Sequence, residues 1–278
     1  MVTGSLFFSV KYNQRSACTA WGQIILLGNI FIIVACVGAA VLFLFVVTRA
    51  SAAPSRKESN DFTGAVVAVI GTTYAVILAF TLSGVWSMFQ QAQANEQQEA
   101  SALVNVFRIA AQLQDANAGQ IHDLCVRYAD NTVGREWATM ESGQMTPEGG
   151  DMINQLWTLA GQIQARAQPN AIAAYQLMEE LRGLTQYRRI RAMQSGEHLP
   201  GILWAVLIAG GIITVVASCL FGVPNYRLHL LQVAMLAFLI SLVLVAIADI
   251  DRPYQGLVRV EPDGFRFAIR TLHNEPSP

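Results

Sequence analysis

Charged residues are scarce in this chain. Lys, Arg, Asp and Glu make up 13% of its 278 residues, while hydrophobic residues make up 53%. Typical soluble domains carry about 25% charged residues. Low charge combined with long apolar segments favours an integral membrane protein. The net charge of −1 argues neither for nor against nucleic acid binding by bulk electrostatics, and we expect no nucleic-acid partner.

Cysteine pairs and enzyme signatures are also missing. The four cysteines, Cys18, Cys36, Cys125 and Cys219, are far apart and form no CxxC pair, which leaves no signal for a disulfide framework or a zinc site. His122 and Cys125 share a helix face, but two ligands do not make a metal site, so we interpret them as a packed or surface pair. No nucleotide-binding, zinc-protease or hydrolase motif occurs. We therefore predict no enzyme, no cofactor and no metal.

Long hydrophobic runs are present instead. Four of them approach or exceed the roughly 20 residues that a membrane-spanning helix needs; they cover about residues 24–47, 62–89, 202–221 and 228–250. The first run is too long for the apolar part of a signal peptide, about 7–15 residues, so we interpret it as a retained membrane helix. The short link at 222–227 predicts that the last two runs form an antiparallel hairpin.

The polar segment between the second and third runs has helical patterning throughout. "QQAQANEQQEASALVNVFRIAAQL" follows the second run without Pro or Gly, so we expect that membrane helix to continue into water. Pro147 and Pro262 are suited to begin later helices. The predicted fold is an all-α integral membrane protein with four transmembrane helices and a large helical cytoplasmic insertion between helices 2 and 3.

We predict five segments along the chain. They are an N-terminal leader (1–23), transmembrane helices 1 and 2 (24–89), a cytoplasmic helical domain (90–199), a hairpin of transmembrane helices 3 and 4 (200–250) and a cytoplasmic C-terminal segment (251–278). Four spans place both termini and the central domain on one side of the membrane. Basic residues are more frequent on that side, which predicts that it is cytoplasmic. The basic residues on that side are Lys11, Arg15, Arg182, Arg188, Arg189, Arg191, Arg252, Arg259, Arg266 and Arg270. Those on the other side are Arg49, Arg56, Lys57 and Arg227.

The second run is the most polar of the four. At helical spacing, one of its faces carries hydroxyl, small and bulky apolar residues: Thr73, Ile77, Phe80, Gly84 and Ser87. Such a face is suited to line a pore, with Ile77 and Phe80 as a hydrophobic constriction that gates by dewetting. Hydroxyl and small residues are equally common where membrane helices pack closely. Both interpretations stay open at this point.

Two clusters of charge flank the central domain. Glu96 and Glu99 lie on nearly the same helix face, where they would ring a cytoplasmic vestibule in a homo-oligomer or simply belong to a solvated face. Arg188, Arg189 and Arg191 precede the third run. They are suited to bind anionic lipid headgroups, or they supply the positive-inside signal alone.

The fourth run ends in "IADIDRPYQG". Asp249 and Asp251 are two residues apart, so on a helix they point about 200° from each other. Asp249 and Arg252 are three apart and can form an ion pair. The motif is then a structural helix exit that ends at Pro253, in which Asp251 braces the turn. The alternative is that Asp249 and Asp251 bind a cation.

Three stretches give the chain a resemblance to a known family. "YAVILAFTLSGVWSMFQQAQANEQQEASAL", "LPGILWAVLIAGGIITVVASCLFGV" and "DIDRPYQGLVRVEP" resemble, in this order, segments of the bestrophin-like domain family of bacterial membrane proteins. The resemblance implies a fold related to bestrophins, which are oligomeric anion channels with four spans and cytoplasmic termini, and it implies a pentamer. The aromatic neck of bestrophins lies on their second span, which adds weight to Phe80. A dense acidic run such as bestrophins use for calcium is missing after Asp251.

These observations predict a homo-oligomeric, bestrophin-like ion channel in the bacterial inner membrane. Transmembrane helix 2 would line its pore, and its partners would be membrane lipids, inorganic ions and further copies of the chain. One subunit has too few polar membrane residues to enclose an ion path, so the oligomer is part of the prediction. The alternative is a membrane-anchored sensor or scaffold whose helical cytoplasmic domain binds a protein partner. Ion selectivity, gating stimulus and subunit number are not determined by the residues.

Overall fold

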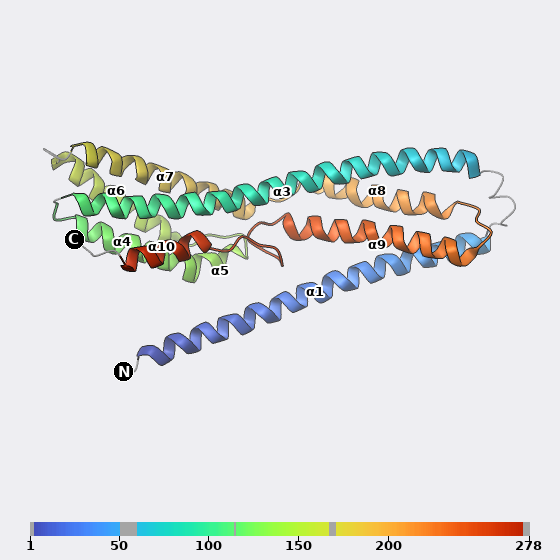
Figure 1. Cartoon of the computed structure of the whole chain (residues 1–278), viewed down its shortest axis with the longest axis horizontal. Helices are drawn as coiled ribbons and strands as arrows, with labels where there is room; N and C mark the ends of the chain where they lie inside the picture. Colours follow the sequence, from blue (N-terminus) through green and yellow to red (C-terminus); the bar gives the residue numbers. More distant parts are fainter. Residues whose placement is uncertain (1–2, 51–59, 114, 167–170, 275–278) are drawn as a thin grey trace. The chain divides into compact units, whose positions relative to one another are not determined.

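The structure is a computed structural model that describes the backbone of residues 3–50, 60–113, 115–166 and 171–274. Side chains are described for residue 23 and from residue 25 onward within these ranges, so Lys11, Arg15, Arg56 and Lys57 lie outside the described side chains. Every regular element in the described part of the chain is a helix (Figure 1). The predicted all-helical fold is therefore confirmed.

The chain divides into two compact units. Unit 1 comprises Met1–Trp86 and Leu199–Asp251, and unit 2 comprises Ser87–His198 and Arg252–Pro278. Unit 1 contains the four helices that are long and apolar enough to cross a membrane, of which one continues into unit 2. Only between 6% and 28% of the most apolar window of each of these helices is buried within the protein. Their apolar side chains therefore face outward, as a lipid solvent requires.

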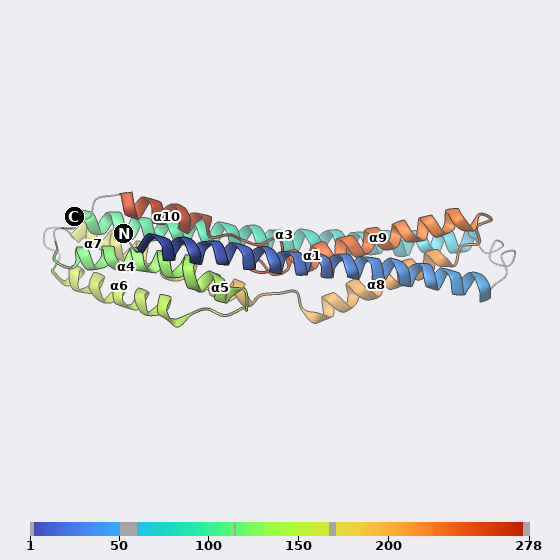
Figure 2. The same ribbon diagram turned by 90° about the horizontal axis from the view of Figure 1, so that it is seen from below.

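The helices of unit 1 follow the predicted runs, but each begins earlier than predicted and α8 ends two residues earlier. They are α1 (Thr3–Ala50), the first part of α3 (Asn60–Gln112), α8 (Gly201–Cys219) and α9 (Tyr226–Ile250). Because α1 already begins at Thr3, the backbone of the predicted leader continues directly into the first span. The α8–α9 hairpin is present as predicted (Figure 2). Asn225 caps α9, since its side chain accepts hydrogen bonds from the backbone N–H groups of Arg227 and Leu228.

Close packing in unit 1 depends on small residues. Ala40 and Ala237 let α1 approach α9, and Leu44, Cys219 and Val233 complete this buried cluster. The Tyr74 ring of α3 lies against Gly210, where an added Cβ would come within 2.6 Å of the ring. The Tyr74 hydroxyl donates to the carbonyl oxygen of Leu207 at 2.9 Å. In a membrane, such contacts replace the hydrophobic effect as the force that joins helices.

Unit 2 is a bundle of shorter helices around the second part of α3. They are α4 (Ala118–Asn131), the π-helix η1 (Thr132–Glu136), α5 (Trp137–Met140), α6 (Pro147–Arg166), α7 (Ala171–Gly196) and α10 (Asp263–Asn274). Leucine, isoleucine and phenylalanine side chains from these elements are fully or almost fully buried, among them Leu103, Ile121, Leu156, Leu181 and Phe265. Burial of this apolar surface supplies most of the stability of such a bundle.

The helix starts predicted from proline are confirmed. Pro147 is the first residue of α6, and α10 begins directly after Pro262. The buried face of α7 includes Ala174, Leu177, Leu181 and Leu184, whereas Tyr175 is exposed.

Candidate functional site

α3 is one uninterrupted helix of 53 residues that belongs to both units (Figure 1). No proline and no glycine-rich segment interrupts it after Gly84, and helix-forming Gln, Glu and Ala residues dominate its second part. The prediction that the second membrane helix continues into a polar helix is confirmed. The apolar part of α3 ends at Phe89, and the residues after it belong to unit 2.

One face of α3 in unit 1 is not covered by the rest of the described chain. Thr73, Phe80 and Gly84 are exposed, and the Phe80 side chain retains 76% of its accessible surface. A Cβ added at Gly84 would meet nothing within 4 Å. Ser87, the first residue of α3 in unit 2, is exposed as well, whereas Ile77 is half-buried. We call Thr73, Ile77, Phe80, Gly84 and Ser87 the outer face of α3.

The opposite face of α3 carries the packing contacts. Tyr74 and Val85 are buried in unit 1. Val85 contacts a cluster that includes Leu199 of the segment before α8 and Ile247 of α9. Because packing within the chain uses this opposite face, it does not explain the hydroxyl and small residues of the outer face. That face is available to lipid, to water or to another copy of the chain.

A buried ion-pair cluster occupies the core of unit 2. Arg191 of α7 is completely buried, and its guanidinium donates to both carboxylate oxygens of Glu99, from Nε to Oε2 at 2.6 Å and from Nη2 to Oε1 at 2.8 Å. The Tyr128 hydroxyl also donates to Glu99, at 2.5 Å. Such a two-pronged arginine–carboxylate pair is among the strongest hydrogen-bonded arrangements in proteins.

The cluster extends to a second carboxylate. Glu136, at the end of η1, accepts from Arg191 Nη2 at 2.9 Å and from both Nη groups of Arg188 at 2.6 Å. Two glutamates and two arginines thus form a neutral group. Burial alone would raise the pKa of Glu136, but the hydrogen bond from Arg188 and the charge of Arg191 outweigh it and hold that pKa below its ordinary value.

Aromatic rings enclose this cluster. The Arg191 guanidinium carbon lies 5.4 Å from the ring centre of Trp137 and 5.8 Å from that of Phe265. The Tyr128 pKa is raised, first by burial and then by the charge of Glu99. A shielded and internally neutral group of this kind has no free acid or base to offer to a substrate. We assign it a structural role, and we call Glu99, Glu136, Arg188 and Arg191 the buried charge cluster.

Glu96 has a different environment from Glu99. Its carboxylate receives the backbone N–H of Phe265 at 3.0 Å, in the first turn of α10. A Cβ added at Gly264 would lie 2.8 Å from the same carboxylate, so a side chain there would displace the Glu96 carboxylate. Burial raises the pKa of Glu96 to about 7, against the lowering effect of the Phe265 and Gly264 N–H groups. Glu96 therefore anchors the N-terminus of α10 within unit 2.

The expected roles of Glu96 and Glu99 in a vestibule need correction. Both side chains are almost fully buried within the chain, so the prediction of a solvated helix face is wrong. A carboxylate in this position also cannot face a water-filled vestibule, because protein atoms replace the water around it. The signal was available in the sequence: Glu96 and Glu99 share a helix face with Ala92 and Leu103, which are both buried.

The predicted lipid-binding arginines need a similar correction. Arg191 and Arg188 belong to the buried charge cluster, and their guanidinium groups are engaged with Glu99 and Glu136. They are therefore not available to a headgroup. Of the three arginines only Arg189 is exposed, so lipid headgroup binding stays a prediction for Arg189.

The exit of α9 is braced by Asp251. Its Oδ1 accepts the backbone N–H of Leu199 at 2.7 Å, and its side chain is almost fully buried. Leu199 directly precedes Pro200, the residue before α8. This bond ties the end of the fourth span to the start of the third and fits the bracing role, but both that role and cation binding by Asp251 stay predictions.

Asp249 is half-buried at the same exit. Arg252, its predicted partner, is exposed and donates to the Gln255 side chain at 3.3 Å. The Asp249–Arg252 pair and an ion-binding role of Asp249 both stay predictions. Asp249 is less deeply buried than Asp251, so it is the member of the motif that remains accessible.

His122 and Cys125 are both buried in α4. The His122 ring stacks on Phe107 with centroids 3.9 Å apart, and its Nε2 lies 2.9 Å from the Phe107 carbonyl oxygen. Burial raises the pKa of the Cys125 thiol, which makes it a poor metal ligand. Within the described residues, no group of three or more potential ligands gathers. The packed interpretation of His122 and Cys125 fits these contacts.

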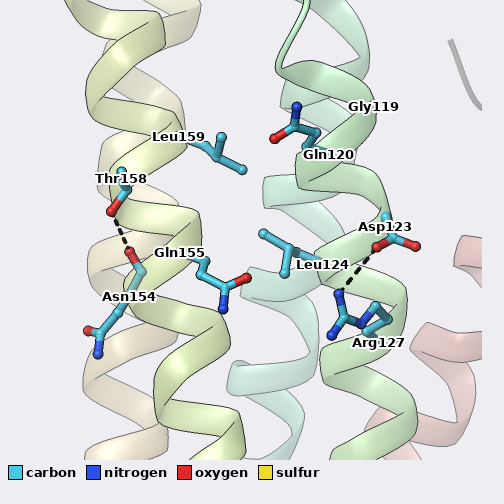
Figure 3. A pocket seen from close by; sticks show the side chains of 9 residues that line it. All are labelled: Gly119, Gln120, Asp123, Leu124, Arg127, Asn154, Gln155, Thr158 and Leu159. Atoms are coloured by element: carbon cyan, nitrogen blue, oxygen red, sulfur yellow. Dashed lines mark hydrogen bonds and ion pairs between the residues drawn. The ribbon is translucent and has the colours of Figure 1, made fainter.

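Each unit also has an open cavity. In unit 2, a cavity of about 560 Å³ lies between α4 and α6. Figure 3 shows the ion pair of Asp123 and Arg127 on one wall and the Thr158 hydroxyl donating to the Asn154 carbonyl oxygen on the other. None of the predicted site residues lines this cavity. In unit 1, a cavity of about 640 Å³ lies between α1, α8 and α9.

Comparison with known proteins identifies relatives of the chain. The family model of the bestrophin-like domain matches residues 34–265. The solved structure of a bacterial bestrophin homolog from Klebsiella pneumoniae superposes with a TM-score of 0.66 at 12% identity, covering 89% of this chain and 99% of that one. The same homolog with an isoleucine-to-threonine mutation gives a TM-score of 0.67 at 12% identity, with coverage of 87% and 99%. No curated protein matches the chain. At such identities the structural likeness shows a common fold.

Proposed function

Because the chain belongs to the bestrophin-like domain family, we propose that it is an ion channel of the bestrophin type. In this proposal several copies surround a central pore, and the outer face of α3 from each copy lines it. The family and the fold support channel function in general. The pore-lining face, the oligomer and the permeating ion are our own inference.

The observation that carries the proposal is the exposure of the outer face of α3. In unit 1 the helix packs inside its subunit through Tyr74 and Val85 and leaves Thr73 and Phe80 uncovered. Hydroxyl groups are more favourable beside water than beside lipid, which favours the axis of an oligomer over the lipid side. A ring of Phe80 side chains would then form an apolar constriction that controls wetting of the pore.

The polar part of the same face supports a continued pathway. Beyond Ser87, exposed Gln91, Ala94 and Gln98 follow at the same helical spacing. Ser87 accepts a hydrogen bond from Gln91 at 3.2 Å. The pore would therefore change from apolar to uncharged polar walls along one helix. The buried charge cluster has no place on this wall, so it gives no argument for cation or anion selectivity.

The proposed setting is the bacterial inner membrane, with both termini and unit 2 in the cytoplasm. The excess of basic residues on that side of the predicted topology supports this orientation. Further copies of the chain, membrane lipids and inorganic ions are the proposed partners. A pentamer is proposed by analogy with bestrophins. We expect no catalytic activity.

Planar bilayer recording of the purified, reconstituted oligomer tests the proposal. The wild-type protein should conduct ions, and Phe80→Ala should raise the unitary conductance at least twofold, because it removes the largest apolar side chain of the outer face. Phe31→Ala is the matched control, since Phe31 is an equally exposed aromatic residue on α1; it should leave the conductance unchanged.

Silent bilayers with an intact oligomer would contradict channel function. If the wild type conducts but Phe80→Ala and Phe31→Ala have equal effects, the chain is a channel whose pore is not lined by this face. A protein partner cross-linked to residues 90–198, together with silent bilayers, would favour the alternative of a membrane-anchored scaffold.

A further inference from the structure

We propose that the cavity between α1, α8 and α9 in unit 1 binds one acyl chain of a membrane phospholipid. Its volume of about 640 Å³ lies within the range of about 300–1,000 Å³ that is typical of ligand sites. All three helices that line it are candidate membrane spans. The cavity therefore opens within the hydrocarbon region, and we call it the acyl groove. This proposal does not depend on ion conduction.

The acyl groove is long and runs along the helices. Its lining extends from Asn29 to Phe43 on α1 and from Trp204 to Val216 on α8. At a rise of about 1.5 Å per residue, these stretches are about 21 Å and about 18 Å long. An extended chain of 16 carbons measures about 19 Å, given C–C bonds of about 1.5 Å. The length of the groove therefore matches a common phospholipid acyl chain.

The groove also accommodates the width of a lipid chain. A hydrocarbon chain is about 4–5 Å wide, as set by the contact distance between carbon atoms, and it can lie lengthwise between the three helices that line the groove.

The walls are chemically suited to hydrocarbon. Ile32, Ile208 and Leu244 are typical lining residues, and Ala39 and Ala248 leave space because their side chains are small. The one hydroxyl group of the lining, on Ser241, donates to the carbonyl oxygen of Ala237 at 2.8 Å. This hydroxyl is therefore already hydrogen-bonded and needs no polar partner from an apolar occupant.

One end of the groove is more polar than the other. Asn29, Trp204 and Ala248 lie at the end where Asp251 and Leu199 join the two spans, as the antiparallel order of α8 and α9 requires. Tryptophan is common at the level of lipid headgroups. The opposite end, at Phe43 and Val216, is apolar. An acyl chain bound here has its headgroup beside Asn29 and its methyl end beside Phe43 and Val216.

Native mass spectrometry of the full-length protein released from nanodiscs tests the acyl groove. The nanodiscs contain equal amounts of phosphatidylcholine with 8-carbon and with 16-carbon chains. Collisional activation removes loosely held lipid. We expect about one retained lipid per subunit, with at least a fivefold preference for 16-carbon chains, because the shorter chain leaves half of the groove empty. This arm needs no mutation.

Two substitutions fill the groove from different helices. Ala39→Phe and Ala248→Phe should each reduce lipid retention at least fivefold, while Val34→Phe, on the outward side of α1, should retain lipid as the wild type does. Elution volume and helical ellipticity verify that each variant is folded. Equal retention in the two filling variants and the control would overturn the proposal. So would a wild type that retains no lipid or shows no preference for chain length.

Discussion

The part of α3 in unit 1 and the part in unit 2 bury different kinds of side chain. In unit 1 the buried side of the helix presents Tyr74 and Val85 to its neighbours, and the exposed side is mainly apolar. In unit 2 the buried side presents Glu96 and Glu99, and the exposed side is rich in glutamine. One helix therefore buries carboxylates in unit 2 and exposes mainly apolar side chains in unit 1.

The comparison shows which interactions hold each unit together. Unit 1 depends on close contact at small residues, such as Tyr74 against Gly210, because lipid offers no hydrophobic force between helices. Unit 2 has an ordinary apolar core, and within it a neutral cluster of four charges joins α3, η1 and α7. Loss of one charge from that cluster should therefore be far more costly than loss of any surface charge.

The largest expected effect is that of Arg191→Ala. The substitution leaves Glu99 buried without its cation and removes one partner of Glu136. Loss of one member of a buried pair costs about 3–5 kcal/mol of stability, which thermal unfolding in detergent should show. Arg127→Ala, which removes an exposed pair with Asp123, should cost at most about 1 kcal/mol. Equal losses of stability in the two variants would show that the buried charge cluster contributes no more than an exposed ion pair.

The corresponding test in unit 1 is Gly210→Val. A side chain at Gly210 collides with the Tyr74 ring, and such overpacking costs about 1–3 kcal/mol. Gly38→Val serves as the control, because a Cβ there meets nothing within 4 Å. Tyr74→Leu combined with Gly210→Val should recover part of the loss. Without that recovery, the contact does not determine the stability of unit 1.

The spans were predictable because lipid requires a fixed length of apolar helix. The helix starts at Pro147 and after Pro262 were predictable because proline suits the first turn of a helix. Continuity of α3 was predictable because no residue between Gly84 and Gln112 interrupts a helix. In each case the cause lies within a few residues of the feature.

The charge cluster was not predictable in this way. Glu99 and Arg191 are 92 residues apart, and neither residue carries a local sign of its partner. Asp251 binds the N–H of Leu199, 52 residues away, whereas local spacing directed attention to Asp249 and Arg252. Spacing tells which side chains share a helix face, but the identity of the neighbour across the interface depends on tertiary packing.

A smaller effect is expected at the exit of α9. Asp251→Ala removes the acceptor of the buried Leu199 N–H, and an unsatisfied buried donor costs about 1–3 kcal/mol. Asp249→Asn should leave the thermal midpoint nearly unchanged if Asp249 serves an ion, and should lower it if Asp249 is a structural partner. Recording reversal potentials of Asp249→Asn channels in a salt gradient separates these roles. A shifted reversal potential with an unchanged midpoint identifies an ion site.

A further expected effect is the pH dependence set by Glu96. Burial raises its pKa in the folded protein from the ordinary 4.5 to about 7, so between these values the folded state binds more protons than the unfolded state. Stability should therefore fall as pH rises from 4.5 to 7. Glu96→Gln should flatten this slope in thermal midpoints measured across that range. A slope that is unchanged in Glu96→Gln would assign the dependence to other groups.

The pH dependence of stability set by Glu136 has the opposite sign to that set by Glu96. The Arg188 hydrogen bond and the Arg191 charge hold its pKa below 4.5 against the effect of burial. Its contribution to stability is therefore present above pH 4.5 and is lost as pH falls below that value. Thermal midpoints of the Glu96→Gln protein should consequently decline only on the acidic side.

Charged thiol reagents test most directly whether the outer face of α3 lines an ion pathway. The four native cysteines are first replaced by alanine, and Thr73→Cys, Ser87→Cys or Val34→Cys is then added. Current through the Thr73→Cys and Ser87→Cys channels should fall by at least half after exposure to a charged methanethiosulfonate, and current through Val34→Cys should not change. Modification that blocks Val34→Cys and spares both α3 positions would contradict the account.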